Sequence, residues 1–212
     1  MTKKVFWQNP YLSRLETTIT SVNGQTVTVA ETIFYAFNGG QESDAGRFGV
    51  HPVREARKDG LEIVYMLDAD HGFAPNDPVT ILIDWDRRYR LMKLHFAAEL
   101  VLELTSRALP GVEKIGAHIA ADKSRVDFAW NTPITPLLPD LQAQANALIA
   151  ADHAIISAFS DEANERRYWE IEGFARVACG GTHLRRTGEI GEIRLKRNNI
   201  GKGKERIEIY LT

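Results

Sequence analysis

The chain has 212 residues, of which 44% are hydrophobic and 25% charged, enough for one large or two small domains with hydrophobic cores. No run of about 18 apolar residues is present, which excludes a transmembrane helix, and the first residues lack the apolar run of a secretory signal. The formal net charge of −2 disfavours indiscriminate nucleic-acid binding, and the single cysteine, Cys179, excludes an intramolecular disulfide. We therefore expect a cytoplasmic protein with neither a membrane nor a DNA partner.

The first third of the chain predicts β-structure. Two β-branched runs, 17–22 and 25–29, flank Asn23-Gly24, a strong short-range signal for a hairpin. Further strands are expected at 32–36, 53–56, 61–67 and 77–83, with a second hairpin turn at Asp59-Gly60. A glycine-rich loop follows the first of these strands at Asn38-Gly39-Gly40-Gln41. Residues 1–82 therefore predict a small β-barrel-like domain with a glycine-rich loop.

The pattern changes after residue 82. Apolar residues recur at helical spacing from Arg87 to Ala108, with Asp84 as the expected N-cap, and a second helix is expected over 140–159. Strands are predicted at 114–120, 126–130, 174–177, 191–195 and 206–211. Residues 83–212 thus predict a second domain of two helices and an antiparallel sheet, which makes the whole chain α+β.

Candidate metal ligands occur in two short clusters. Cys179 and His183 are separated by two glycines and a threonine, and glycines allow the tight turn that would bring both donors to one ion. His95 and Glu99 are four residues apart on the first helix and therefore share a face. Taken singly, the cysteine is more often a small buried hydrophobe, with nucleophile and metal ligand as the alternatives, and the helical pair is more often a hydrogen-bonded pair at the core rim. Together, the four side chains are the ligand types of a Zn²⁺ site.

Positive charge is concentrated near the C-terminus. Between Arg185 and Arg206 there are eight Lys or Arg residues and three Glu residues, a local net charge of +5 on a body of −7. Such a segment can recruit phosphate groups, although solvated, basic edge strands that block aggregation are more common. The candidates for phosphate contacts are Arg185, Arg186, Lys202 and Lys204.

Three segments together resemble a known family. The tail reads Cys179-Gly-Gly-Thr-His183 followed by Thr187-Gly-Glu-Ile-Gly191, and the loop region reads Phe34-Tyr-Ala-Phe-Asn-Gly-Gly-Gln-Glu-Ser-Asp-Ala-Gly46. With the His95 helix between them, these segments resemble the editing domain of alanyl-tRNA synthetase, and even more the free-standing alanyl-tRNA editing proteins. The resemblance runs from about Glu31 to Leu211. It implies that residues 83–212 form a metal-dependent editing domain, the second additional domain.

The resemblance also implies a reaction and a set of site residues. It implies an enzyme that acts in trans and hydrolyses the ester between a noncognate serine or glycine and the 3′ end of tRNA(Ala), with zinc as cofactor. Gln41 would face the pocket and position water or substrate, although by itself it would be read as a solvated loop residue. Thr182 would line the pocket, and Asp44 would either assist catalysis or stabilise its loop through an Asx turn.

Two residues depart from the family pattern. Glu99 stands where the family usually has a second histidine, and Phe96 stands where a threonine is common. Glutamate can ligate zinc, but it lowers the net charge of the site and favours a harder metal, while Phe96 would reshape the amino-acid pocket. Two other functions therefore stay open: a tRNA- or metal-binding homologue with altered catalysis, and a deacylase for another aminoacyl-tRNA, such as the threonyl type.

Overall fold

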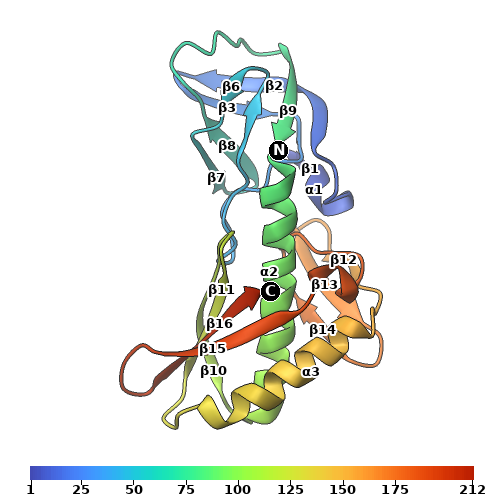
Figure 1. The fold of residues 1–212 in the computed structure, drawn as a ribbon. Helices are drawn as coiled ribbons and strands as arrows, with labels where there is room; N and C mark the ends of the chain where they lie inside the picture. Colours follow the sequence, from blue (N-terminus) through green and yellow to red (C-terminus); the bar gives the residue numbers. More distant parts are fainter. The chain divides into compact units, whose positions relative to one another are not determined.

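The computed structural model describes residues 1–212, which divide into two compact units. Unit 1 comprises residues 1–38 and 42–89, and unit 2 comprises residues 39–41 and 90–212. The division falls inside a long helix, α2 (Trp85–Ala108), whereas the sequence placed a domain boundary just before this helix. Helices combine with mostly antiparallel sheets, so the α+β class is confirmed (Figure 1). No helix in the structure is both long and apolar enough to span a membrane.

Unit 1 is built on an open seven-stranded antiparallel sheet with the order β6-β5-β9-β2-β3-β8-β7. Its strands are β2 (Arg14–Asn23), β3 (Thr26–Val29), β5 (Gly46–Phe48), β6 (His51–Pro52), β7 (Glu55–Asp59), β8 (Glu62–Met66) and β9 (Pro78–Ile83). A separate parallel pair joins β1 (Lys3–Lys4) to β4 (Glu31–Thr32), and α1 spans Val5–Gln8. Alternate side chains of the sheet, among them Ile19, Val27, Tyr65 and Ile81, are fully buried and form the core of the unit.

Both hairpins expected in this unit are present, with turns at Asn23-Gly24 and Asp59-Gly60. The predicted strand at 32–36 is wrong beyond Thr32, where β4 ends. The backbone N–H of Phe34 donates to Thr32 Oγ1 at 3.0 Å, and that of Tyr35 donates to Asp44 Oδ2 at 2.7 Å. These donors therefore bind side chains instead of a neighbouring strand, so residues 33–36 are not part of a sheet.

Unit 2 combines two helices with two antiparallel sheets. The first sheet has the order β10-β11-β16-β15, with β10 (Glu113–Ile119), β11 (Ser124–Ala129), β15 (Ile193–Asn199) and β16 (Lys204–Leu211). The second consists of β12 (Ile156–Asp161), β13 (Arg166–Ile171) and β14 (Ala175–Ala178). The remaining elements are α3 (Leu138–Ala150) and two short 3-10 helices, η1 (Thr135–Leu137) and η2 (Thr187–Ile190). Figure 1 shows α3 in yellow and the β15–β16 hairpin in red.

The second predicted helix is too long. α3 ends at Ala150, and residues 156–159, expected to be helical, belong to strand β12 (Ile156–Asp161). Asp152 has a φ of 50°, which the helix cannot accommodate, and its carboxylate accepts hydrogen bonds from Arg186 Nε at 2.7 Å and from the Gly188 N–H at 3.1 Å. The partner strand β13 was not predicted. Asp84 does cap α2, because its Oδ1 accepts the Arg87 N–H at 3.0 Å.

Candidate metal centre

Three metal-ligating side chains meet inside unit 2. His95 comes from α2, and Cys179 and His183 come from the loop that follows β14. Their donor atoms all lie within 4.8 Å of one another. Cys179 Sγ is 3.2 Å from His95 Nε2 and 3.3 Å from His183 Nε2. Residues 84 positions apart in the sequence are therefore brought to one point, as the two clusters of candidate ligands led us to expect.

The backbone around this loop explains how the donors converge. The Cys179 N–H donates to the Arg167 carbonyl at 2.9 Å, which holds the start of the loop against β13. A Cβ at Gly181 would lie 2.5 Å from His95 Cε1, so only glycine lets the loop pass this close to the imidazole. His183 is oriented by Ser157 of β12, whose Oγ lies 2.8 Å from Nδ1. The other imidazole nitrogen of His183 is thereby directed at the sulfur.

Burial sets the charge state of the three donors. Burial lowers the pKa of His95, and Glu99 partly opposes this effect. Burial also lowers the pKa of His183 well below the usual value, and His95 and Arg167 lower it further. Burial raises the pKa of the Cys179 thiol, and the neighbouring Glu99 raises it further. The buried Nδ1 of His95 has no hydrogen-bond partner. Two neutral imidazoles and a thiol thus face one another, and a soft divalent cation would complement this donor set.

Glu99 lies at the edge of the cluster. Its Oε1 is 3.7 Å from Cys179 Sγ and 3.8 Å from His95 Nε2, while its Oε2 accepts the indole N–H of Trp169 at 2.9 Å. It is not among the residues whose donor atoms all lie within 4.8 Å of one another. The fully buried Phe96 packs edge-on against the rings of Trp169 and His183, with centroid distances of 5.1 and 5.8 Å. Both residues that depart from the family pattern therefore contact the metal centre or its supporting shell.

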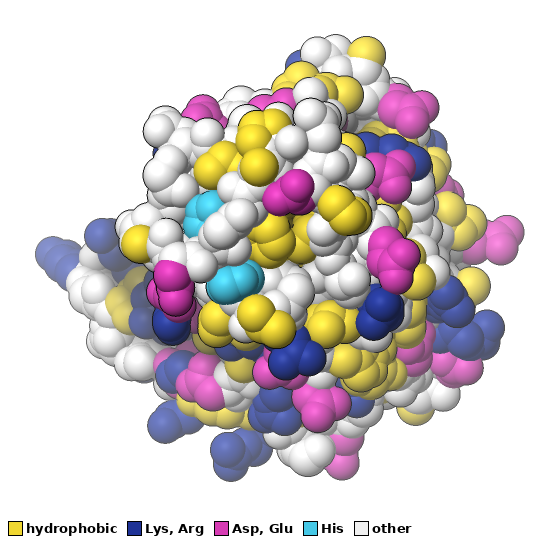
Figure 2. Space-filling model, turned by 90° about the horizontal axis from the view of Figure 1, so that it is seen from above, with side chains coloured by type: hydrophobic (Ala, Val, Ile, Leu, Met, Phe, Trp, Pro, Cys, Tyr) yellow, Lys and Arg dark blue, Asp and Glu magenta, His cyan; other side chains and the backbone are white.

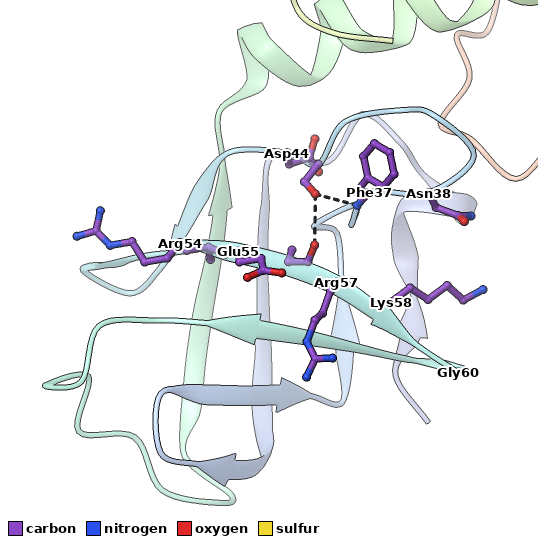
Figure 3. Close-up of a pocket in the computed structure, with 11 residues that line it drawn as sticks. Phe37, Asn38, Asp44, Arg54, Glu55, Arg57, Lys58 and Gly60 are labelled. Carbon is purple, nitrogen blue, oxygen red and sulfur yellow. Dashed lines mark hydrogen bonds between the residues drawn. The ribbon is translucent and has the colours of Figure 1, made fainter. Parts of the chain in front are cut away.

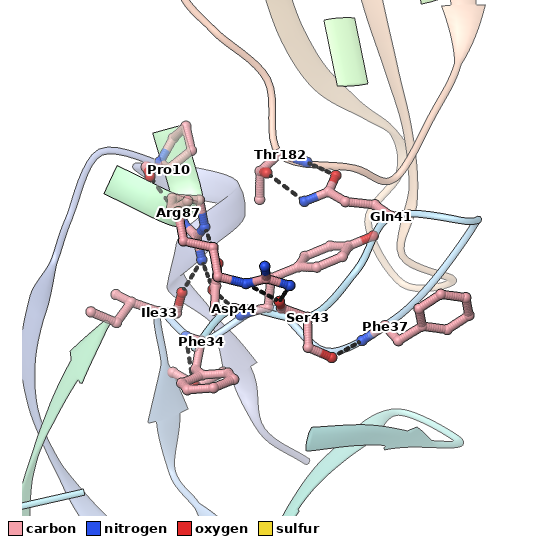
Figure 4. A network of polar contacts seen from close by, with 12 residues as sticks. Pro10, Ile33, Phe34, Phe37, Gln41, Ser43, Asp44, Arg87 and Thr182 are labelled. Atoms are coloured by element: carbon pink, nitrogen blue, oxygen red, sulfur yellow. Dashed lines mark hydrogen bonds and ion pairs between the residues drawn. The ribbon is translucent and has the colours of Figure 1, made fainter. Parts of the chain in front are cut away.

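Gln41 and Thr182 form a buried pair beside the same loop. Gln41 Nε2 donates to Thr182 Oγ1 at 2.9 Å, and the Thr182 N–H donates to Gln41 Oε1 at 3.4 Å (Figure 4). Gln41 belongs to unit 2 because it forms a parallel bridge with Ile119, next to the Ile119 N–H bond to the Gly40 carbonyl. Gly40 has a φ of 88°, and a Cβ there would lie 2.6 Å from the Ala117 carbonyl oxygen. The glycine-rich loop therefore allows Gln41 to pack closely against β10.

Asp44 has a different setting, inside unit 1. Its Oδ1 accepts Arg88 Nε at 2.8 Å, and its Oδ2 accepts both Arg88 Nη2 and the Tyr35 N–H (Figure 4). The fully buried Arg88 also donates to the carbonyls of Ile33 at 2.6 Å and Pro10 at 3.0 Å. Both carboxylate oxygens are thus engaged in holding the loop. Arg88 was not singled out from the sequence, although its position three residues before the buried Leu91 places both on one helical face.

The four candidate phosphate contacts are exposed and occupy two separate places in unit 2. Arg185 and Arg186 precede η2, where the Arg186 guanidinium pairs with Asp152. Lys202 lies in the turn between β15 and β16, and Lys204 is the first residue of β16. Acidic, basic and hydrophobic side chains are interspersed on the molecular face shown in Figure 2, in keeping with the small net charge of the chain.

Sequence reasoning missed Ser157 and Trp169, which hold His183 and Glu99. Ser157 fell within a stretch expected to be helical, and Trp169 lies in a strand that was not predicted. The one available sequence signal for that strand was the alternation of apolar and polar residues in Trp169-Glu170-Ile171.

A family model and several relatives match this chain. A family model described as "Threonyl and Alanyl tRNA synthetase second additional domain" matches residues 168–208, the segment that contains Cys179 and His183. The chain therefore carries part of the domain that defines this class of tRNA-related proteins.

Relatives extend the match to the whole chain. An alanyl-tRNA editing protein AlaX-M of Methanosarcina mazei is 32% identical over 250 residues, which cover 100% of this chain and 97% of the relative. The AlaX-M protein of Pyrococcus horikoshii is 29% identical over 215 residues, covering 100% and 98%. The alanine–tRNA ligase of Ignicoccus hospitalis is 32% identical over 98% of this chain but only 26% of the ligase. The chain belongs to the alanyl-tRNA editing protein family.

Proposed function

We propose that this protein is an editing hydrolase that acts in trans, and that it deacylates tRNA(Ala) mischarged with serine or glycine. The observation that carries the proposal is the convergence of His95, Cys179 and His183 within 4.8 Å in a chain of this family. The ligase match adds support, because nearly the whole chain aligns with a segment that makes up about a quarter of that alanine–tRNA ligase. A free-standing protein of this kind would act on an ester that a synthetase has already released.

We propose zinc as the cofactor, held by His95, Cys179 and His183. The donor set fits, because imidazole nitrogen and cysteine sulfur are typical zinc ligands and both imidazoles are directed at the sulfur. The carboxylate of Glu99 lies beside the same sulfur, and a thiolate there would repel it unless a cation lay between them. Zinc bound here would supply a Lewis acid next to the ester. Glu99 is the proposed fourth ligand through Oε1, the oxygen that Trp169 does not hold.

The protein groups beside the metal centre would bind and orient the ester. Gln41 offers a buried amide whose geometry Thr182 holds at both ends, so it can place a water or the substrate without reorganising. Ser157 would keep His183 in one tautomer. For Asp44 we propose a structural role, since Arg88 and the Tyr35 N–H engage both of its oxygens.

Transfer RNA is the proposed partner. Arg185, Arg186, Lys202 and Lys204 are the proposed phosphate contacts, which would contribute affinity without reading bases. Because Arg186 is already paired with Asp152, its contribution would be smaller than that of the lysines.

The direct test is to incubate the zinc-loaded protein with a panel of aminoacyl-tRNAs and to measure loss of the ester. The panel contains seryl-, glycyl- and alanyl-tRNA(Ala), together with threonyl-tRNA(Thr). We expect loss of the seryl or glycyl ester and retention of the alanyl ester. The Cys179→Ala protein serves as the inactive control. Hydrolysis of the threonyl ester alone would favour the alternative deacylase, and tight tRNA binding with no turnover on any ester would favour a binding homologue.

A further inference from the structure

Unit 1 contains a pocket of about 790 Å³ that the proposed function does not use. One side is the start of the glycine-rich loop, with Phe37 and Asn38, and the other is the edge strand β7, with Glu55, Arg57 and Lys58 (Figure 3). Strand β7 pairs only with β8, so its outer edge faces this loop. The pocket is therefore bounded by one aromatic side chain and several charged ones.

Phe37 is exposed although the structure gives its backbone a fixed place. Its side chain is 52% exposed, while the preceding Ala36 is buried. Its N–H donates to Ser43 Oγ at 2.8 Å, and the same hydroxyl lies 3.4 Å from the Ala56 carbonyl of β7. The loop is thus attached to the strand, and Phe37 is one of the residues that line the pocket (Figure 3). A solvent-exposed aromatic ring is a stacking surface for another flat group.

The charges around the pocket favour an anion. Arg57 and Lys58 are adjacent, exposed residues of β7, and both line the pocket. The acidic groups are weaker competitors, because Asp44 is neutralised by Arg88 and only Glu55 remains among the lining carboxylates. Basic residues on an edge strand also block aggregation, but that role requires neither a pocket nor an exposed ring beside them.

We propose that this pocket binds an unpaired nucleotide of the tRNA, with its base stacked on Phe37 and its phosphates contacted by Arg57 and Lys58. Aromatic stacking combined with nearby cations is how proteins hold single-stranded nucleic acid without reading its sequence. The inference rests on the proposed function, because it takes tRNA as the ligand. Among the unpaired nucleotides we choose those of the 3′ end, because the ester of the proposed reaction is attached there.

Binding of uncharged tRNA(Ala) tests the stacking contact separately from hydrolysis. Affinities are measured for the intact tRNA and for the same tRNA without its unpaired 3′ nucleotides. We expect Phe37→Ala to weaken binding of the intact tRNA by about 5- to 150-fold, to have no effect with the trimmed tRNA, and Phe37→Trp to retain the wild-type affinity. Val50→Ala, which removes another exposed hydrophobic side chain of unit 1, is the matched control and should change neither affinity.

The charge contact has its own test. Arg57→Gln should reduce the slope of log affinity against log salt by about 0.7, the value for one phosphate contact to a single strand. Arg47→Gln, an exposed arginine of β5 that does not line the pocket, is the control and should leave the slope unchanged. Unfolding curves of all variants verify that they fold.

The outcomes separate the two proposals. If Phe37→Ala binds intact and trimmed tRNA as tightly as the wild type does, the pocket proposal is overturned, whatever the wild type hydrolyses. If Phe37→Ala loses affinity for the intact tRNA only, while the wild-type protein hydrolyses none of the mischarged esters, the pocket proposal stands and the editing function falls.

Discussion

Two buried polar clusters, one in each unit, show how differently a protein can treat groups removed from water. In unit 1, the carboxylate of Asp44 meets the guanidinium of Arg88, and carbonyl oxygens accept the remaining guanidinium protons. In unit 2, His95, Cys179 and His183 are directed at one another with no opposite charge among them, and His95 Nδ1 has no hydrogen-bond partner. The first cluster is complete within the protein, whereas the second would be completed by the proposed cation.

The contrast separates a structural polar cluster from a functional one. Both contain residues that the sequence made candidates for the active site, and both are buried, so neither motif membership nor burial distinguishes them. What distinguishes them is the partner that each group faces, because Asp44 faces the opposite charge of Arg88, whereas the two imidazoles and the thiol face only one another. The following predictions test this distinction, beginning with the largest expected effect.

Removing Arg88 should destabilise the protein most. Arg88→Met leaves the carboxylate of Asp44 buried without its counter-ion, and we expect a loss of about 3–5 kcal/mol in the free energy of unfolding. Urea denaturation of the metal-free protein measures it. The double variant Arg88→Met/Asp44→Asn should recover part of the loss, because no charge then remains unpaired. Equal stability of the wild type and Arg88→Met would show that the pair is not a structural unit.

Removing a proposed ligand of the metal centre should strongly weaken metal binding and leave the fold largely intact. We expect Cys179→Ser and His183→Ala each to weaken zinc binding by more than about 100-fold, the upper range for residues that only support a ligand. Elemental analysis and competition with a chelating dye measure this affinity. Unchanged zinc stoichiometry in both variants would rule out the proposed centre.

Glu99 offers a sharper question about the same centre. If its carboxylate is the fourth ligand, Glu99→Ala should lower zinc affinity about as much as loss of the other ligands, whereas Glu99→His should keep the metal. If the Glu99→Ala protein still binds zinc at full occupancy, Glu99 is not a ligand and only accepts the hydrogen bond from Trp169. X-ray absorption at the zinc edge gives a second reading, because it reports the number of nitrogen, oxygen and sulfur donors.

A smaller effect is expected from Ser157, which contacts a ligand and not the metal. Ser157→Ala removes the hydrogen bond to His183 Nδ1, and we expect zinc affinity to fall by about 10- to 100-fold. Ser160→Ala is the matched control, because Ser160 lies on the same strand and bonds only to the Arg166 carbonyl near the surface. If the two variants bind zinc equally well, Ser157 does not orient the imidazole.

The last prediction concerns pH. Burial lowers the pKa values of His95 and His183 in the folded, metal-free protein below the value of about 6.5 expected when unfolded. The unfolded chain then binds more protons, so their contribution to stability is present above pH 6.5 and is lost as the pH falls. Each histidine adds a slope of up to about 1.4 kcal/mol per pH unit. Urea denaturation between pH 7 and 5.5 should show a smaller slope for His183→Gln; an unchanged slope would contradict the burial argument.

Much of the candidate site could be predicted from local sequence. Helical periodicity alone places His95 and Glu99 on one face of the helix, and the two glycines between Cys179 and His183 signal a tight turn. The hairpins at Asn23-Gly24 and Asp59-Gly60 were equally local, because these dipeptides suit the turn itself. In each case neighbouring residues specify the structure by their own conformational preferences.

Other features depended on residues far apart in the chain. Nothing near Asp44 in sequence indicates that Arg88 will neutralise it, and nothing near Ser157 indicates a strand that supports His183. β12 exists because β13 pairs with it, and the end of α3 is set by the contacts of Asp152 with Arg186 and Gly188. The sequence by itself determined which donor types were available and the turns that carry them. The tertiary structure alone decided which of the buried polar groups find partners, because that depends on long-range packing that no local pattern encodes.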